Sequence, residues 1–264
     1  MPTDQLGLEW QGVEQLDIVY RDEHIVAINK PAGLLVHRSP IDRHETRFAL
    51  QLLRDQLGQR VYPVHRLDKP TSGVLLFALS PEVARQLSEQ FADRGVEKEY
   101  LAVCRGYCPE QGIIDHPLKD RPDRIVDRDR SQELPVREAT TRFQTLAGVE
   151  IPYAVDRYPQ SRYSLVLLQP ETGRKHQLRR HMKHVGHPII GDAKHGKGVH
   201  NRFFQQQYQC SRLLLACTGM RFKHPLGFED VKLVAPLDAQ WHRVLNAFGW
   251  SNSVPRPWTA WEDD

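Results

Sequence analysis

The sequence contains few cysteines and no long hydrophobic segment. Its longest uninterrupted apolar run, residues 74–79, has six residues, whereas a helix that crosses a membrane needs about 20. The first 17 residues hold neither a basic leader nor an apolar stretch, so we expect no secretory signal and a cytoplasmic protein. These absences argue against an exported protein and against one that is embedded in a membrane.

Four cysteines in 264 residues are too few for a disulfide scaffold. Cys104 and Cys108 are separated by three residues, and Cys210 and Cys217 by six, unlike the C-x2-C pairs of structural zinc sites. Six of the 13 histidines lie between residues 176 and 200, which raises the alternative of a zinc hydrolase. Their spacings of five, three and three differ from H-E-x-x-H, and Arg and Lys surround them. We therefore expect reduced thiols and no metal.

The charge of the chain is nearly balanced but unevenly distributed. The 36 Lys and Arg exceed the 33 Asp and Glu by only three. Residues 172–187, however, hold five Lys or Arg, four His and no acid. Such a concentration is typical of a phosphate-binding surface, and the alternative is a solvated basic helix face. No glycine-rich loop of the kind that binds the phosphates of nucleotides occurs.

The hydrophobic pattern alternates between strand and helix without a regular repeat, which predicts an α+β fold with a mixed, mainly antiparallel sheet. We expect an N-terminal extension over 1–16 and a tail over 251–264, and the length of the chain allows one large domain or two small ones between them. Residues 115–138 are charged and interrupted by proline, and predict a mobile surface excursion. Strands are predicted at 18–20, 25–29, 74–79, 96–107, 162–170, 213–218 and 231–234, and helices at 48–57, from 81 to about 94, and at 174–186.

Three segments place unusual polar groups beside turns. Asp68 lies in a loop before a buried strand, where an Asx turn or a reactive carboxylate are both possible. Tyr100 lies in a predicted strand, where an ordinary half-buried tyrosine is the alternative. On the predicted helix Arg174 shares the apolar face of Leu178, and a cation there needs an anionic partner such as Asp68.

Taken together, these segments resemble the large family of pseudouridine synthases that modify uridines in ribosomal and transfer RNA. The resemblance covers about residues 17–250. The matching text is NKPAGLLVH (29–37), HRLDKPTSGVLL (65–76), KEYLAVCRG (98–106) and TGRKHQLRRHMKHVGHPIIGDAKHG (172–196). It implies one mixed-sheet domain with flanking helices and a central RNA-binding cleft, acting without a cofactor or metal.

The resemblance also implies roles for individual residues. Asp68 would be the catalytic carboxylate, Tyr100 would stack on the base and help with the C5 proton, and Arg174 would pair with Asp68. Leu178 would wall the uracil pocket, and Arg66 would fill the space left by a flipped nucleotide. Further RNA contacts would come from His65, Lys175, Arg179, Arg180 and Lys183. The last three are expected on the polar side of the helix.

Within this family the sequence is most similar to the branch that acts on uridine 65 of tRNA. The segments at 37–43, 157–181 and 248–250 point there. Alternatives are a pseudouridine synthase acting on ribosomal RNA and, in a different class, a non-catalytic RNA-binding module. The module would not need Asp68, Tyr100 and Arg174 together. We expect an RNA partner, no membrane and no obligate protein partner.

Overall fold

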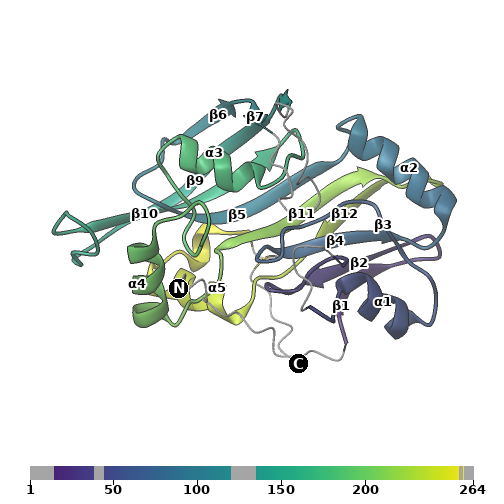
Figure 1. Cartoon of the computed structure of the whole chain (residues 1–264), viewed down its shortest axis with the longest axis horizontal. Helices are drawn as coiled ribbons and strands as arrows, with labels where there is room; N and C mark the ends of the chain where they lie inside the picture. The colour runs from purple at the N-terminus through teal and green to yellow at the C-terminus, as the bar shows by residue number, and fades with distance from the viewer. Residues whose placement is uncertain (1–14, 39–44, 120–134, 256–257, 259–264) are drawn as a thin grey trace, which may run out of the picture.

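A computed structural model describes residues 15–38, 45–119, 135–255 and 258. Strands and helices alternate along this part of the chain without a repeating unit (Figure 1). The strands are β1 (Asp17–Arg21), β2 (Ile25–Lys30), β3 (Tyr62–Pro63), β4 (Ser72–Ala78), β5 (Glu97–Arg105), β6 (Gln111–Asp115), β7 (Leu118–Lys119), β8 (Val136–Arg137), β9 (Thr140–Ile151), β10 (Ser161–Pro170), β11 (Leu215–Lys223) and β12 (Asp230–Val234). The helices are α1 (Ala49–Leu57), α2 (Pro81–Ala92), α3 (Gln177–His184), α4 (Gly198–Tyr208), α5 (Ala239–Ala247) and the short 3-10 turn η1 (Ser251–Ser253).

One ten-stranded sheet forms the framework. Its main path runs β1-β2-β4-β11-β5-β10-β9-β6, while β12 pairs with β11 and β3 with β4. Every pairing is antiparallel except that of β4 with β11. The prediction of a mixed, mainly antiparallel sheet in an α+β fold is therefore confirmed.

The parallel pair β4–β11 joins the two halves of the sheet. Gly73 faces Cys217 across this pair, with φ near 106°. A Cβ atom at Gly73 would lie 2.0 Å from the Cys217 carbonyl oxygen. Only glycine tolerates both this conformation and this approach, so the Thr-Ser-Gly turn holds the start of β4 directly beside β11.

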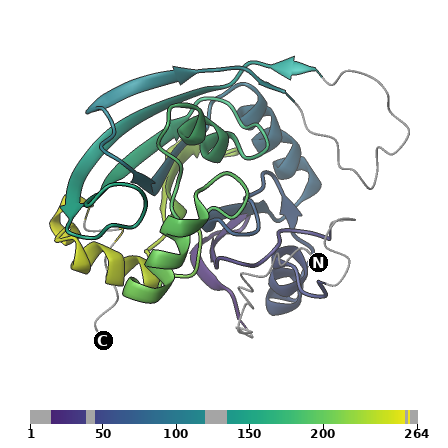
Figure 2. The same ribbon diagram turned by 60° about the vertical axis from the view of Figure 1, so that its left-hand side comes forward.

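Helices cover the sheet in separate places and divide its core. One hydrophobic cluster joins β1, β2 and β4 to α1 and α2. A second joins β5 and β10 to α4 and α5, and a third packs α3 against the same two strands. Figure 1 shows α1 and α2 at one end of the sheet and α4 and α5 at the other. Figure 2 shows the long strands curving along one side of the molecule, with the helices inside the curve.

Local signals account for the helices that the sequence predicted best. The Ser80 hydroxyl accepts a hydrogen bond from the Val83 amide at 3.3 Å, and Pro81 occupies the first position of α2. Gly58 ends α1 in the left-handed conformation, with φ near 65°. These two helices and the predicted strands before residue 107 all form.

Other parts differ from the predictions. Within the segment predicted as a surface excursion, β7 and β8 pair antiparallel, and 120–134 lie outside the described residues. The predicted extension also lies outside them, apart from residues 15 and 16. In the predicted tail, Val254 and Trp258 are buried in the cluster beneath α5, so this part of the tail belongs to the packed domain. No described helix is long and apolar enough to span a membrane.

Candidate active site

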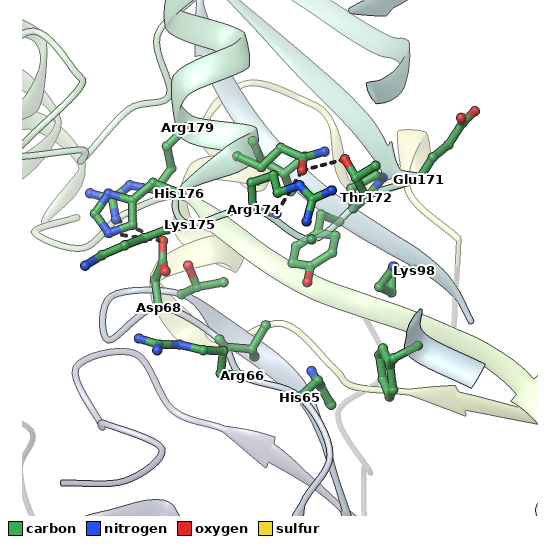
Figure 3. A pocket seen from close by; sticks show the side chains of 18 of the residues that line it. His65, Arg66, Asp68, Lys98, Glu171, Thr172, Arg174, Lys175, His176 and Arg179 are labelled. Carbon is green, nitrogen blue, oxygen red and sulfur yellow. Dashed lines mark hydrogen bonds and ion pairs between the residues drawn. The ribbon is translucent and has the colours of Figure 1, made fainter. Parts of the chain in front are cut away.

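A pocket of about 470 Å³ opens where the loop before β4 faces β5 and the start of α3. This volume falls within the range of sites that hold small ligands or single bases. Its lining brings together three predicted residues that are distant in sequence, Asp68, Tyr100 and Leu178. Figure 3 shows Asp68, Lys175 and His176 on one side of it and Arg174 beside Thr172.

Hydrogen bonds to backbone carbonyls hold the loop that carries Asp68 in place. The Asp68 carbonyl accepts a hydrogen bond from the Thr71 amide at 3.0 Å, closing a turn. The fully buried Lys30 ammonium donates to the carbonyls of Pro31, Leu34 and Lys69, the last of these in the loop itself. Burial lowers the pKa of Lys30 well below its ordinary value. This anchoring holds the Asp68 side chain at the rim of the pocket.

Arg179 is the ion-pair partner of Asp68. Its Nη1 donates to Asp68 Oδ2 at 3.0 Å, while its Nε and Nη2 donate to the two oxygens of Asp192 at 2.7 and 2.8 Å. The side chains of Arg179 and Asp192 are 6% and 0% exposed, so this pair lies away from water. Burial opposes the charge of Arg179, yet the bonds to Asp192 and the charge of both acids raise its pKa. The guanidinium of Arg179, held in place by Asp192, therefore orients the Asp68 carboxylate.

Asp192 supports this arrangement as an anion. Burial favours its neutral form, but the hydrogen bonds from Arg179 and from the amides of His195 and Lys194 outweigh that effect and lower its pKa. Because Asp192 takes two of the guanidinium donors, a third remains for Asp68.

His176 also lies beside Asp68 but does not supply a charge. Its Nε2 is 3.9 Å from Asp68 Oδ2, and its Nδ1 lies 3.0 Å from His195 Nε2. Burial lowers the pKa of His176 to about 4 despite the nearby carboxylate. The ring is therefore neutral near pH 7, and Arg179 is the cation that balances Asp68.

Tyr100 forms part of the pocket wall from the middle of β5, where it stands between Leu168 of β10 and Cys217 of β11. Burial raises its pKa well above the ordinary value, and Cys217 and Asp68 add to the shift. Leu178, 6% exposed, contributes an apolar surface from α3. A protonated phenol and a leucine thus face a space that could hold a planar base.

His65 stabilises the loop through the backbone of the neighbouring strand. Its Nε2 accepts a hydrogen bond from the Leu76 amide at 2.9 Å, and its ring stacks on Phe91 with centroids 4.9 Å apart. Burial lowers the pKa of His65 to about 3, with a further contribution from Lys98. The accepted hydrogen bond requires a neutral ring, which has its proton on Nδ1.

The pocket is strongly basic. Six Lys or Arg and only two Asp or Glu line it, namely Arg66, Arg94, Lys98, Arg174, Lys175 and Arg179 against Asp68 and Glu171. Arg66 and Lys175 are exposed at its edge. Burial lowers the pKa of Lys98, whose ammonium lies 6.0 Å from the centre of the Phe91 ring. Such a surface suits an anion much larger than the pocket itself.

Two predictions for the basic segment are wrong. Arg174 does not pair with Asp68, because its Nε donates to the Glu138 carbonyl at 3.0 Å. Arg179 does not lie on the polar side of the helix, since only 5% of it is exposed. Both errors have one cause: α3 begins at Gln177, so Arg174 precedes the helix and the assumed face does not exist.

The late start of α3 follows from the side chain of Gln177. Its Oε1 accepts hydrogen bonds from the Thr172 hydroxyl and the Arg174 amide, and its amide group donates to Thr140 and Thr141. His176 precedes it in the left-handed conformation, with φ near 55°. Of the other predicted contacts, Lys183 is exposed and Arg180 donates to the Lys119 carbonyl at 3.0 Å.

Asp192 and His176 were missed as site residues by the sequence reasoning. A signal for Asp192 exists in the sequence: it is the first acid after Glu171, at the end of the basic segment. A buried arginine in that segment would be expected to find its partner there. No comparable signal distinguishes His176 from the neighbouring histidines.

The comparisons with known proteins agree with this geometry. Residues 24–184 match the family model described as RNA pseudouridylate synthase. The chain is 50% identical to "tRNA pseudouridine synthase C" of Vibrio parahaemolyticus, over 91% of this chain and 98% of that protein. It is 55% identical to the protein of the same name from Haemophilus ducreyi, over 89% of this chain and 97% of the other.

A solved structure shows the same fold. Human RNA pseudouridylate synthase domain containing 4 superposes with a TM-score of 0.66 at 26% identity, covering 88% of this chain and 93% of that one. The matched family segment includes the loop of Asp68, the strand of Tyr100 and the helix of Arg179. The chain therefore belongs to the family of RNA pseudouridylate synthases, enzymes that isomerise uridine within RNA.

Proposed function

We propose that this enzyme converts a uridine of tRNA to pseudouridine, that uridine 65 is the target, and that Asp68 is the catalytic carboxylate. The reaction breaks the N1–C1′ bond, turns the uracil over and joins C5 to C1′. Uracil C5 loses a proton and N1 gains one, so the composition of the RNA is unchanged. The observation that carries the proposal is the Asp68–Arg179–Asp192 arrangement, of which Asp68 and Arg179 line a basic pocket.

Asp68 is suited to act on the sugar or the base because, within the part of the chain that the structure describes, only its Oδ2 accepts a hydrogen bond. Arg179 contacts Oδ2, and among the described residues no hydrogen bond reaches Oδ1. The side chain is 20% exposed and opens into the pocket. Two chemical routes fit this placement: attack on the sugar or base by the carboxylate, or removal of a proton to give a glycal-like intermediate.

Arg179, rather than Arg174, is the residue that we propose positions Asp68. Its guanidinium is held by Asp192 in two hydrogen bonds, so the third bond, to Asp68 Oδ2, comes from a donor group of fixed orientation. A guanidinium remains charged through the reaction, so it offsets the negative charge of Asp68 without giving it a proton.

Tyr100 and Leu178 would bind the flipped uracil between a ring and an aliphatic side chain. Because burial raises the pKa of Tyr100, its phenol remains protonated at neutral pH. We therefore assign it stacking and the relay of the C5 proton through its hydroxyl, and not the role of a phenolate base. Arg66, exposed at the rim of the pocket, is placed to occupy the gap that flipping leaves in the RNA.

Binding of the surrounding RNA is assigned to the cations at the pocket edge and on α3. Arg66, Arg174 and Lys175 lie at the pocket, and Lys183 is exposed on the helix that carries Arg179. The preference for tRNA rests on the names of the curated relatives at about half identity, and uridine 65 rests on the sequence segments described above. A pseudouridine synthase for ribosomal RNA is the alternative.

Release of tritium from [5-³H]uridine measures the reaction directly, because C5 loses its hydrogen when it bonds to C1′. Three transcripts are compared: a tRNA with uridine 65, the same tRNA with cytidine 65, and a ribosomal RNA fragment. We expect one tritium per molecule from the first and none from the others. Equal release from the cytidine variant contradicts uridine 65, and release from ribosomal RNA alone favours the alternative. Release from no RNA contradicts the proposed activity.

A further inference from the structure

A pair of cysteines lies close together at the end of β5, outside the pocket. Cys104 is fully buried in the strand and Cys108 is half-buried just beyond it, and neither forms a disulfide. The chain turns at Gly106, where φ is near 84°, and the Cys108 amide donates to the Ser164 hydroxyl at 3.0 Å. Ser164 stands directly opposite Cys104 in the antiparallel register of β5 and β10. The turn therefore brings Cys108 back beside Cys104.

His187 completes this cluster and its tautomer is fixed. Its Nδ1 lies 2.9 Å from the Arg105 carbonyl, which can only accept, so Nδ1 must carry a hydrogen. Cys108 packs against the hydrophobic cluster that contains Cys104, and the His187 ring lies against Gly106 in the turn between the two cysteines. Cys104 and His187 both lower the pKa of the Cys108 thiol. Because Nδ1 is occupied, Nε2 is the atom left to face the Cys108 sulfur. The ring is thus oriented by a backbone carbonyl to serve a cysteine, an arrangement that activates thiols.

The charges around the cluster favour a thiolate at Cys108 and a thiol at Cys104. The hydrogen bond from Cys104 lowers the pKa of Cys108 most, and His187 lowers it further. The same contact with Cys108 raises the pKa of His187. Burial raises the pKa of the Cys104 thiol well above its ordinary value. Arg105 is the neighbouring cation, and it lies 3.8 Å from Asp156.

We propose that Cys104 and Cys108 are an oxidant-sensitive pair, in which Cys108 reacts with a hydroperoxide and Cys104 then closes a disulfide. In the first step Cys108 gives its thiol proton to His187 Nε2 and attacks hydrogen peroxide as a thiolate, the O–O bond breaks, and Cys108 becomes a sulfenic acid. The hydroxide released takes a proton from His187 and leaves as water. In the second step Cys104 attacks the sulfenic sulfur, and its proton and the departing hydroxide form a second water. The two thiols lose two electrons and the peroxide gains them.

This site is separate from the isomerisation chemistry. None of its three side chains lines the pocket, and the established reaction needs no redox step. The sulfur that reacts first is the more exposed of the two, as a peroxide-sensitive thiol requires. The failure of one proposal therefore leaves the other untouched.

The sequence provides a clear test, because trypsin cleaves after Arg105, between the two cysteines. Peptides 99–105 and 106–119 then carry Cys104 and Cys108 separately, and only a disulfide holds them together. The native full-length protein is treated with hydrogen peroxide, alkylated and digested without reductant. We expect the linked peptides to form and to separate after reduction. Cys210 and Cys217, both buried, should stay reduced and serve as internal controls.

Two variants test the assigned roles. In Cys104→Ser the sulfenic acid at Cys108 has no partner, so it should be captured by dimedone. In His187→Gln, alkylation of Cys108 at pH 6 should slow about fivefold or more, because the thiolate is the reacting species. Thermal unfolding verifies that both variants fold. Absence of linked peptides in the wild type, earlier oxidation of Cys210 or Cys217, or unchanged alkylation in His187→Gln would each overturn the proposal.

Discussion

Replacing Arg179 with methionine should abolish most of the activity, whereas the same change at Arg174 should have a much smaller effect. Arg179→Met removes one hydrogen bond from Asp68 and two from Asp192. Asp192 has no exposed side-chain surface, and breaking a buried pair by removing one partner costs about 3–5 kcal/mol. Displacement of a catalytic group by about 1 Å costs about 100-fold in rate. We therefore expect at least that loss in single-turnover tritium release, with a lower unfolding midpoint.

A double variant separates catalysis from folding. Arg179→Met combined with Asp192→Asn removes the uncompensated buried anion, while the asparagine oxygen can still accept from the His195 and Lys194 amides. The unfolding midpoint should recover much of its loss and the activity should not, because Asp68 still lacks its partner. Arg174→Met serves as the matched control, since Arg174 contacts the Glu138 carbonyl. Retained activity in Arg179→Met together with loss in Arg174→Met would refute the assignment.

Two further predictions concern binding and stability. Lys183→Gln should make the plot of log Kobs for RNA binding against log salt concentration less steep, by up to about 0.7–0.9 in slope, because one phosphate contact is lost. Turnover at saturating RNA should stay unchanged. Lys232→Gln on β12 is the control. An unaltered slope would indicate a solvated lysine. His65 has a folded pKa of about 3 against an ordinary 6.5, so below pH 6.5 the unfolded state binds the proton more readily and stability falls toward pH 3. His65→Gln should weaken that decline in urea unfolding at pH 4–7, and an identical decline would contradict the buried neutral ring.

The helices and strands that could be predicted from the sequence are those that neighbouring residues specify. The cap at Ser80 and the glycine at Gly58 define α2 and α1 with no information from distant residues. β9 was missed because a shift in its register with β10, between Thr145 and Ala147, interrupts the alternation of its buried and exposed side chains. Its hydrogen bonds to β10 and β6 hold it in place, and pairing between separate strands cannot be recognised from a short stretch of sequence. For α5 a signal was available, since Asp238 caps it by accepting from two backbone amides.

The sequence predicted which residues lie at the candidate site better than it predicted which of them pair with one another. Asp68, Tyr100 and Leu178 do meet in one pocket, as the resemblance implied. The partner of Asp68 was misassigned because the start of α3 is set by Gln177, whose bonds reach Thr140 and Thr141 on another strand. A helix boundary that depends on such distant contacts cannot be predicted from hydrophobic periodicity. An error of a few residues in the start of the helix changes which of its arginines are expected to be buried.

The most direct test of the central claim is single-turnover tritium release by Asp68→Asn on the uridine 65 transcript. Asparagine keeps the size of the side chain and can still accept from Arg179, so folding and RNA affinity should stay close to wild type. Because it can neither attack nor take up a proton as a carboxylate does, the rate should fall by several orders of magnitude. A rate above about a hundredth of the wild-type value would show that Asp68 is not the catalytic group.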